Sequence, residues 1–269
     1  MSAAHTETLL DRARSGDDEA LLALLEAVQP QVYRFGLQMC RQPEDAEDVL
    51  QDTLLTLARS FRDFRGASSL STWLYTITRS VCIKRRRKSK YAPEALTPID
   101  DAVIADAAPR QDAVVEHKQT WAIVAEAIRG LPEDQREVLI LRDVEGLSTK
   151  AVAEVVDETE AAVKSRLHRA RGSLRATISG RSRLPKRPEC PDIRTIFSEH
   201  LEGTLAPEVC SRMEKHLSDC PTCAAECAGL RETLAMCSQA STTVPPDIQA
   251  RITSCVARVL HHHPEEVSP

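Results

Sequence analysis

The chain has 269 residues, enough for two or three small domains, and its aromatic content of 3% argues against a large sheet enzyme. The formal net charge of −5 conceals separate basic and acidic segments, so local charge decides which partners each surface attracts. We find no run of about 18 apolar residues and no signal-peptide pattern, so we expect a cytoplasmic protein with no membrane partner.

The first predicted domain covers residues 1–90 and is helical, because apolar residues recur there at helical spacing. Asp17 is expected to cap one helix, and Pro43 to open the next, whose first turn is acidic. Residues 61–71 contain a glycine and several serines, which predicts a loop. A helix with a basic end is predicted over residues 72–88.

The rest of the chain divides into two further helical domains and two linkers. Residues 91–115 contain prolines and acidic residues without an apolar face, which indicates a linker. Helical periodicity resumes over residues 116–180, and a basic linker follows at 181–188. Residues 189–269 contain seven of the nine cysteines and form the predicted regulatory domain. No strand-like alternation of useful length occurs, so the fold class is predicted to be all-α.

Residues 146–175 have the form of a helix-turn-helix. Ser148 and Thr159 are expected to cap its two helices, with Asp157 in the turn. One apolar stripe of the second helix is predicted to be buried, which leaves other side chains to meet base edges or phosphates. These candidate DNA-binding residues are Glu160, Ala161, Lys164, Ser165, Arg166, His168, Arg169 and Arg171. A charged, solvated helix hairpin is the alternative interpretation.

The first domain contains a second candidate nucleic-acid surface, where cations and aromatic residues occur together as single-stranded bases require. Its residues are Arg62, Phe64, Arg65, Ser68, Ser69, Arg79, Lys84, Arg85 and Arg86. Trp73 lies in the same segment but is better explained as a core residue. The basic run at residues 84–90 also fits a solvated helix end.

Four motifs in order resemble extracytoplasmic-function (ECF) sigma factors over roughly residues 8–178. They are DAEDVLQDT at 45–53, STWLY at 71–75, GLPEDQREV at 130–138 and VKSRLHRAR at 163–171. The resemblance implies two helical domains that bind core RNA polymerase and promoter DNA, one at the −10 element and one at the −35 element.

The same resemblance assigns roles to residues by position. The residues expected to face the clamp of the polymerase β′ subunit are Asp45, Glu47, Asp48, Gln51 and Asp52. The loop at 61–71 would bind the melted −10 strand, and the helix from Glu160 the −35 duplex. The chain departs from the family at Leu54 and Ala58, where aromatic residues are usual. It also has Val-Asp at 156–157 in place of the usual Leu-Gly.

The spacing His216-x3-Cys220-x2-Cys223 is typical of a zinc site, because a Cys-x2-Cys turn places two thiolates on one ion. His216 lies one helical turn before Cys220, and Cys190 is expected to supply the fourth ligand. Clustered cysteines in a reducing compartment bind metal more often than they form disulfides.

Residues 190–230 also resemble the zinc-binding anti-sigma domain, through the motif FSEHLEGTL at 197–205 and the segment 210–223. In that family a histidine or cysteine near the position of Cys190 joins the other three ligands. A fused domain of this kind resembles the CorE-like metal-dependent sigma factors. This architecture implies control by copper, zinc or cadmium, with no separate anti-sigma factor required.

Further soft donors exceed the four of one site and indicate a second, responsive site. They are Cys210, Cys227, Cys237, Cys255, His261, His262 and His263. Cys210 is alternatively a small buried residue, and the three histidines a polar tail. Cys40 and Cys82 are expected in the helical core.

These patterns together predict an ECF-type sigma factor whose activity is controlled by metal binding to its cysteine-rich domain. One alternative is a sigma factor under thiol redox control, in which oxidation expels zinc. A second alternative is a metal-buffering protein that is not a sigma factor. An enzyme is not expected, since we find no carboxylate pair, glycine-rich phosphate loop or nucleophile–base set.

Overall fold

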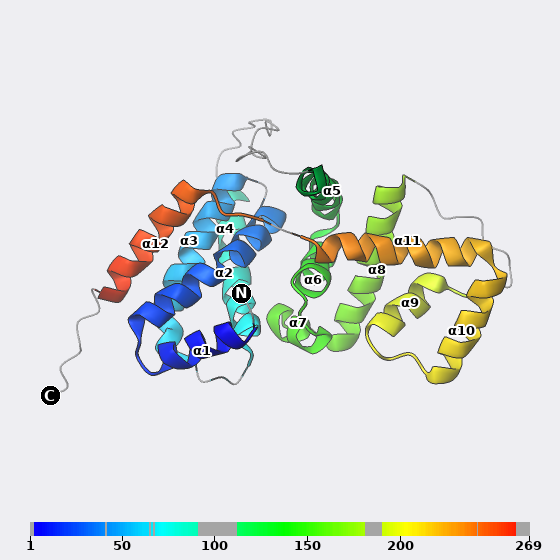
Figure 1. Cartoon of the computed structure of the whole chain (residues 1–269), viewed down its shortest axis with the longest axis horizontal. Helices are drawn as coiled ribbons and strands as arrows, with labels where there is room; N and C mark the ends of the chain where they lie inside the picture. The colour runs from blue at the N-terminus through cyan, green and yellow to red at the C-terminus, as the bar shows by residue number, and fades with distance from the viewer. Residues whose placement is uncertain are drawn as a thin grey trace. The chain divides into compact units, whose positions relative to one another are not determined.

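The computed structural model describes residues 3–40, 42–64, 66, 68–90, 112–180, 190–240 and 242–261 (Figure 1). Within these ranges the secondary structure is helical and contains no strand, which confirms the all-α prediction. None of the described helices is long and apolar enough to cross a bilayer. The expected linkers fall largely outside the described residues, although α5 (Asp112–Arg129) begins inside the segment 91–115.

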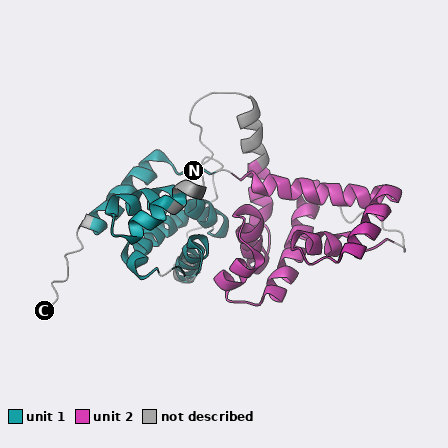
Figure 2. Cartoon of the chain, turned by 60° about the horizontal axis from the view of Figure 1, so that its bottom comes forward, with its two compact units in different colours: residues 1–105, 242–269 teal, residues 106–241 magenta. Residues whose placement is uncertain are grey.

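The chain divides into two compact units, residues 1–105 with 242–269 and residues 106–241 (Figure 2). The first unit contains α1 (Ala3–Arg14), α2 (Asp18–Met39), α3 (Pro43–Ser60), η1 (Phe61–Asp63), α4 (Leu70–Lys90) and α12 (Pro246–His261). Asp17 caps α2 by accepting a hydrogen bond from the backbone N–H of Ala20, and Pro43 opens α3. Both helix starts are therefore as predicted.

Helix α12 packs against α2 and α3 of the first unit, although these helices are far from it in the sequence (Figure 1). Its side chains Ile248, Ile252 and Val256 are buried in the same core as the apolar residues of α2 and α3. Gln29 Nε2 also donates to Thr253 Oγ1, at 3.2 Å. We expected residues 189–269 to form one domain, whereas this contact divides the segment between the two units.

The second unit combines the helix-turn-helix with the cysteine-rich helices. It contains α5, α6 (Glu133–Leu139), the π-helical η3 (Ile140–Val144), α7 (Thr149–Val156), α8 (Glu160–Ser179), α9 (Ile193–Leu201), α10 (Pro207–Asp219) and α11 (Pro221–Ser238). Ser148 and Thr159 cap α7 and α8 as predicted. Asp157 ends α7 in the left-handed conformation, with φ of 57°.

The stripe predicted on α8 is buried, since Val163, Leu167 and Leu174 are 0% exposed. Helices α9 and α11 pack against α8, and α11 also packs against α5 and η3. A separate small core joins Ile193, Phe197 and Leu230 to three cysteines. The cysteine-rich helices of the second unit are therefore attached to the helix-turn-helix.

Candidate metal centre and nucleic-acid interface

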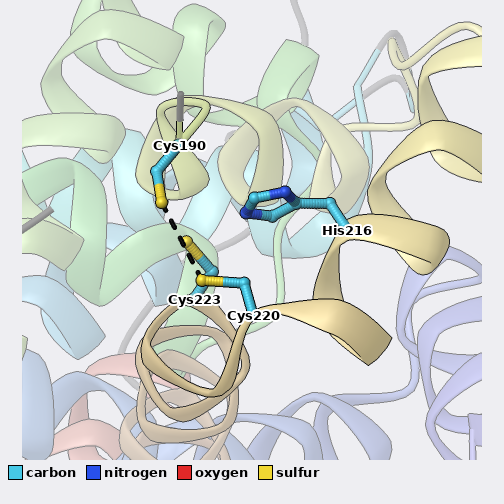
Figure 3. A group of neighbouring side chains, drawn as sticks. All are labelled: Cys190, His216, Cys220 and Cys223. Atoms are coloured by element: carbon cyan, nitrogen blue, oxygen red, sulfur yellow. Dashed lines mark hydrogen bonds between the residues drawn. The ribbon is translucent and has the colours of Figure 1, made fainter. Parts of the chain in front are cut away.

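Four predicted ligands meet where the start of α9, the end of α10 and the start of α11 come together. Cys190 lies just before α9, His216 in the last turn of α10, and Cys220 and Cys223 at the start of α11. Their ligand atoms all lie within 4.8 Å of one another. Figure 3 shows the four side chains converging from these three helical elements. The backbone N–H of Cys220 donates to the carbonyl oxygen of His216, which fixes the bend between α10 and α11.

The donor set fits a tetrahedral zinc-type ion. The Sγ atoms of Cys190 and Cys220 are 3.8 Å apart. Two thiolates about 2.3 Å from one tetrahedral zinc ion lie about that far apart. The Nε2 atom of His216 is buried and has no hydrogen-bond partner among the described residues, as expected of a nitrogen reserved for an ion. The cluster could therefore hold one ion with three thiolates and one imidazole.

The two cysteines at the start of α11 differ in acidity. The backbone N–H of Cys223 donates to Cys220 and lowers the pKa of that thiol. Burial, in contrast, raises the pKa of Cys223 to about 12. Metal binding requires both thiols to lose their protons, so it is coupled to pH.

The second metal site that we expected is not assembled among the described residues, where only one group of donors meets. Cys227 and Cys237 are buried on α11, and Cys210 is half-buried on α10. Cys255 belongs to α12 in the first unit. His262 and His263 lie outside the described residues, as does the side chain of His261. Cys40 and Cys82 are 4% and 1% exposed, which confirms their placement in the core.

The predicted polymerase-binding residues all lie on α3 and are partly buried. Arg85 of α4 forms an ion pair with Asp48, at 2.6 Å, although we expected this arginine to bind DNA. Glu47 pairs with Arg251 of α12 at 2.7 Å. Burial raises the pKa of Asp45. Much of the acidic side of α3 is thus engaged by cations of the chain itself.

The predicted −10 surface contains an aromatic cluster. Phe64 stacks on Trp73 with ring centroids 4.8 Å apart, and Trp73 also packs on the core, as expected. Phe64 is 9% exposed, so it is less available to a base than we expected. Arg62, Ser69 and Lys84 are exposed, whereas Ser68, Arg79 and Arg86 are half-buried. Arg65 lies outside the described residues.

Half of the candidate DNA-binding residues of α8 are exposed. Glu160, Ala161, Ser165 and Arg169 are exposed, and Lys164, Arg166 and His168 are half-buried. Arg166 is paired with Glu158 at 2.6 Å. The predicted outward orientation of Arg171 is wrong, because its side chain is 3% exposed and is paired with carboxylates. Helical periodicity alone did not reveal these partners.

Arg171 belongs to a buried polar network between the helix-turn-helix and α9. Its guanidinium donates to both carboxylate oxygens of Asp143, at 2.8 and 2.7 Å. It also donates to Ser198 Oγ and to Glu202 Oε1, each at 2.9 Å. Burial would raise the pKa of Glu202, but the hydrogen bonds from Thr149 and Arg171 outweigh it and lower the pKa. The sequence motif at 197–205 contained Glu202 but did not indicate its role.

Comparisons with known proteins match three parts of the chain to described families. Residues 24–91 match Sigma-70 region 2, residues 121–174 match Sigma-70 region 4, and residues 190–224 match a putative zinc-finger. The first two ranges lie in the helical segments assigned above to polymerase and promoter binding. The third contains the four-ligand cluster.

Two curated relatives show the extent of the similarity. The ECF RNA polymerase sigma factor SigM of Mycobacterium tuberculosis is 34% identical over 161 residues, which are 60% of this chain and 78% of that protein. The ECF RNA polymerase sigma factor SigW of Bacillus subtilis is 27% identical over 178 residues, which are 63% of this chain and 94% of that protein.

Two solved structures are similar at 23% identity. The sigma factor RpoE in complex with the anti-sigma factor NepR, from Bartonella quintana, has a TM-score of 0.43 and covers 62% of this chain and 98% of its own. CnrH in complex with the cytosolic domain of CnrY has a TM-score of 0.47 and covers 66% of this chain and 99% of its own.

Proposed function

Because the chain belongs to the family of ECF RNA polymerase sigma factors, we propose that it directs polymerase to specific promoters under the control of a bound metal ion. Sigma factors are transcription initiation factors and not enzymes, as the sequence indicated. The family assignment is incompatible with a metal-buffering protein that is not a sigma factor. Zinc fits the donor set, and copper and cadmium are the other soft ions to be tested.

The position of the four ligands carries the proposal of metal control. They connect the starts of α9 and α11, and both of these helices pack against α8 of the helix-turn-helix. A bound ion would cross-link the ends of α9, α10 and α11 and so favour one packing of these helices. The described arrangement would then hold region 4 in a state with reduced promoter binding.

Helix α12 supports the same proposal in the first unit. It covers part of α3, where Glu47 is one of the residues predicted to face the polymerase clamp. The clamp and α12 would therefore compete for this side of α3. In this scheme, full activity requires α12 to leave α3 and α9–α11 to loosen from α8.

We propose that this chain needs no separate anti-sigma factor, because its own C-terminal segment covers both sigma regions. The two similar solved structures stand against this expectation, since each contains a separate protein bound to the sigma factor: an anti-sigma factor in one and the cytosolic domain of CnrY in the other. Run-off transcription with purified core polymerase and no anti-sigma factor tests the point. A self-inhibited chain would show low transcription under these conditions.

Thiol redox control is the second candidate. The 3.8 Å separation of the Cys190 and Cys220 sulfur atoms favours it, because peroxide could oxidise this pair to a disulfide and remove two ligands. An anaerobic metal titration separates the two mechanisms. A response to metal without oxidant would exclude a purely redox trigger.

Run-off transcription with purified core polymerase tests metal control directly. The protein is compared without metal and with zinc, Cu(I) or cadmium, beside a Cys220→Ser/Cys223→Ser variant and a Cys210→Ser control. Because the ion favours the packed arrangement, we expect bound metal to lower transcription in the wild type and in the control but not in the double variant. A full metal response in the double variant would refute the proposal.

A further inference from the structure

The side chain of Glu202 fills a small polar site on the helix-turn-helix. Its carboxylate is 2% exposed and accepts hydrogen bonds from Arg171 at 2.9 Å, Arg142 at 3.3 Å and the hydroxyl of Thr149. These three donors come from three different elements, α8, η3 and α7. Glu202 itself follows α9, so one carboxylate from the cysteine-rich helices connects all three parts of region 4.

We propose that Arg142, Thr149 and Arg171 form an anion site that binds a phosphate of the DNA backbone, and that Glu202 occupies this site as an internal competitor. The inference deepens the proposed function. It rests on that function only in naming DNA as the molecule that supplies the anion, since the anion site itself follows from the contacts.

The charges around the site favour an anion. Asp143 forms a bidentate pair with Arg171 and neutralises that cation. Arg142 remains, together with the hydroxyl of Thr149, which is the first residue of α7 and lies at the positive end of the helix dipole. A site with this balance is satisfied by one negative charge, and the lowered pKa of Glu202 shows that the site prefers the ionised carboxylate.

The position of Thr149 identifies phosphate as the competing anion. In a helix-turn-helix, the first helix crosses the DNA backbone while the second enters the major groove. Here α7 is that first helix, and its N-terminus carries the site. Arginine, threonine and helix N-termini are among the groups that contact phosphates in protein–DNA complexes. A carboxylate and a phosphate cannot occupy the same donors, so occupation by Glu202 excludes a DNA phosphate from this site.

The same contact connects the site to the metal centre. Cys190 lies just before the first turn of α9, and Glu202 directly follows its last residue. Ser198 in the same helix adds a second bond to Arg171. Arg194 of α9 also pairs with Glu226 of α11 at 2.9 Å. Ligation at the start of α9 therefore helps to hold Glu202 in place.

The test measures binding of the full-length, zinc-loaded chain to a fluorescent DNA duplex of random sequence, because phosphate contacts are independent of sequence. Glu202→Gln is compared with wild type and with Glu199→Gln, an equal charge change at an exposed position of α9. We expect Glu202→Gln to bind about tenfold more tightly, which corresponds to about 1.4 kcal/mol. Its salt dependence should steepen by about one phosphate contact. Unchanged affinity, or an equal gain in Glu199→Gln, would overturn the proposal.

Two further variants establish that the gain arises at this site. Arg142→Gln added to Glu202→Gln should remove most of the gain, and a full gain in this double variant would contradict a phosphate at Arg142. Ser198→Ala removes a contact of α9 without changing any donor or charge, so it should give a smaller gain in the same direction. It also serves as the test if Glu202→Gln loses zinc or helical content; no gain in a folded Ser198→Ala would then overturn the proposal.

Inorganic phosphate is also titrated against Glu202→Gln in the absence of DNA. Binding of phosphate by a variant that shows no gain for DNA would mean that the site takes the free anion and not the DNA backbone. The assay contains no polymerase and keeps zinc constant. A negative result in this DNA-binding assay would therefore refute the anion site but say nothing about metal control of transcription. Conversely, a transcription assay without a metal response would refute metal control and leave the DNA-binding result unchanged.

Discussion

At the scale of single residues, the metal centre depends on a histidine whose free nitrogen has no other partner. A buried polar atom without a hydrogen bond costs roughly 1–3 kcal/mol, so His216 Nε2 is a source of instability unless it ligates an ion. The raised pKa of Cys223 is different, because its thiol stays protonated without an ion and must lose that proton when a metal binds. Metal binding would remove the cost at His216 and so stabilise the cysteine-rich helices.

Cys237 provides a test of the expected second site. It is 0% exposed, and burial raises its pKa to about 12. Since alkylation requires the thiolate, we predict that iodoacetamide leaves Cys237 unmodified in the folded protein at pH 8, while Cys210 reacts. Mass spectrometry of tryptic peptides measures both. Rapid modification of Cys237 would mean that α11 opens and that this thiol is available as a ligand.

The ligands could be predicted from sequence, and Arg171 could not, for a physical reason. Cys220 and Cys223 are neighbours in the chain, so their spacing alone fixes their proximity. The partners Asp143 and Glu202 lie in other elements, and nothing in the periodicity of α8 indicates them. From the sequence alone, Arg171 is therefore predicted to face solvent, and only the positions of Asp143 and Glu202 in the structure show that it is buried.

At the scale of secondary-structure elements, the turn between α7 and α8 forms without the glycine usual in the family. Asp157 adopts φ of 57° there, and its backbone N–H donates to the carbonyl oxygen of Ala153. A left-handed conformation costs a non-glycine residue roughly 1–2 kcal/mol, although aspartate tolerates it better than most residues. The altered turn sequence therefore keeps the helix-turn-helix geometry at some cost in stability.

We predict that Asp157→Gly stabilises the second unit by up to about 1 kcal/mol, because glycine adopts positive φ without steric cost. Chemical denaturation followed by circular dichroism measures this change. Glu154→Gly, at an exposed position inside α7, is the matched control and should destabilise by about 0.5–1 kcal/mol. Destabilisation by Asp157→Gly would show that the aspartate side chain makes a contribution larger than the strain.

Helix starts were predictable because capping residues act within one turn, as Asp17, Ser148 and Thr159 show. The partner of α12 was not predictable in this way. Its apolar residues indicate a helix with one buried face, but that face fits any apolar groove of suitable shape. Only the structure shows that Ile252 packs with α2 and α3 of the first unit.

At the scale of the whole molecule, the contact of α12 with α3 is suited to reversible attachment. Three apolar side chains are buried, but the polar pair Gln29 and Thr253 lies in the same interface. The ion pair of Arg251 with Glu47 is exposed on the arginine side and adds at most about 1 kcal/mol. Apolar burial therefore dominates the attachment.

We predict that Ile252→Ala weakens this attachment by about 2–5 kcal/mol, the usual cost of such a truncation in a core. Amide exchange in α12 should accelerate, and core polymerase should bind the variant more tightly than the wild type. Ser254→Ala, at an exposed position of the same helix, should change neither. Faster exchange without tighter polymerase binding would show that α12 does not cover the surface that polymerase uses.

Removal of zinc tests whether the metal centre communicates with both sigma regions. Two of the four ligands, Cys220 and Cys223, lie at the start of α11. This helix ends at Ser238 and α12 begins at Pro246, so only a short connection separates the two helices. Disorder that begins in α11 can spread along this short connection to the first turn of α12. After chelation we predict faster amide exchange first in α9 and α11, then in α12, with α1 unchanged. If α12 keeps its full protection, metal control acts on region 4 alone, through Glu202, and polymerase binding should not respond to zinc.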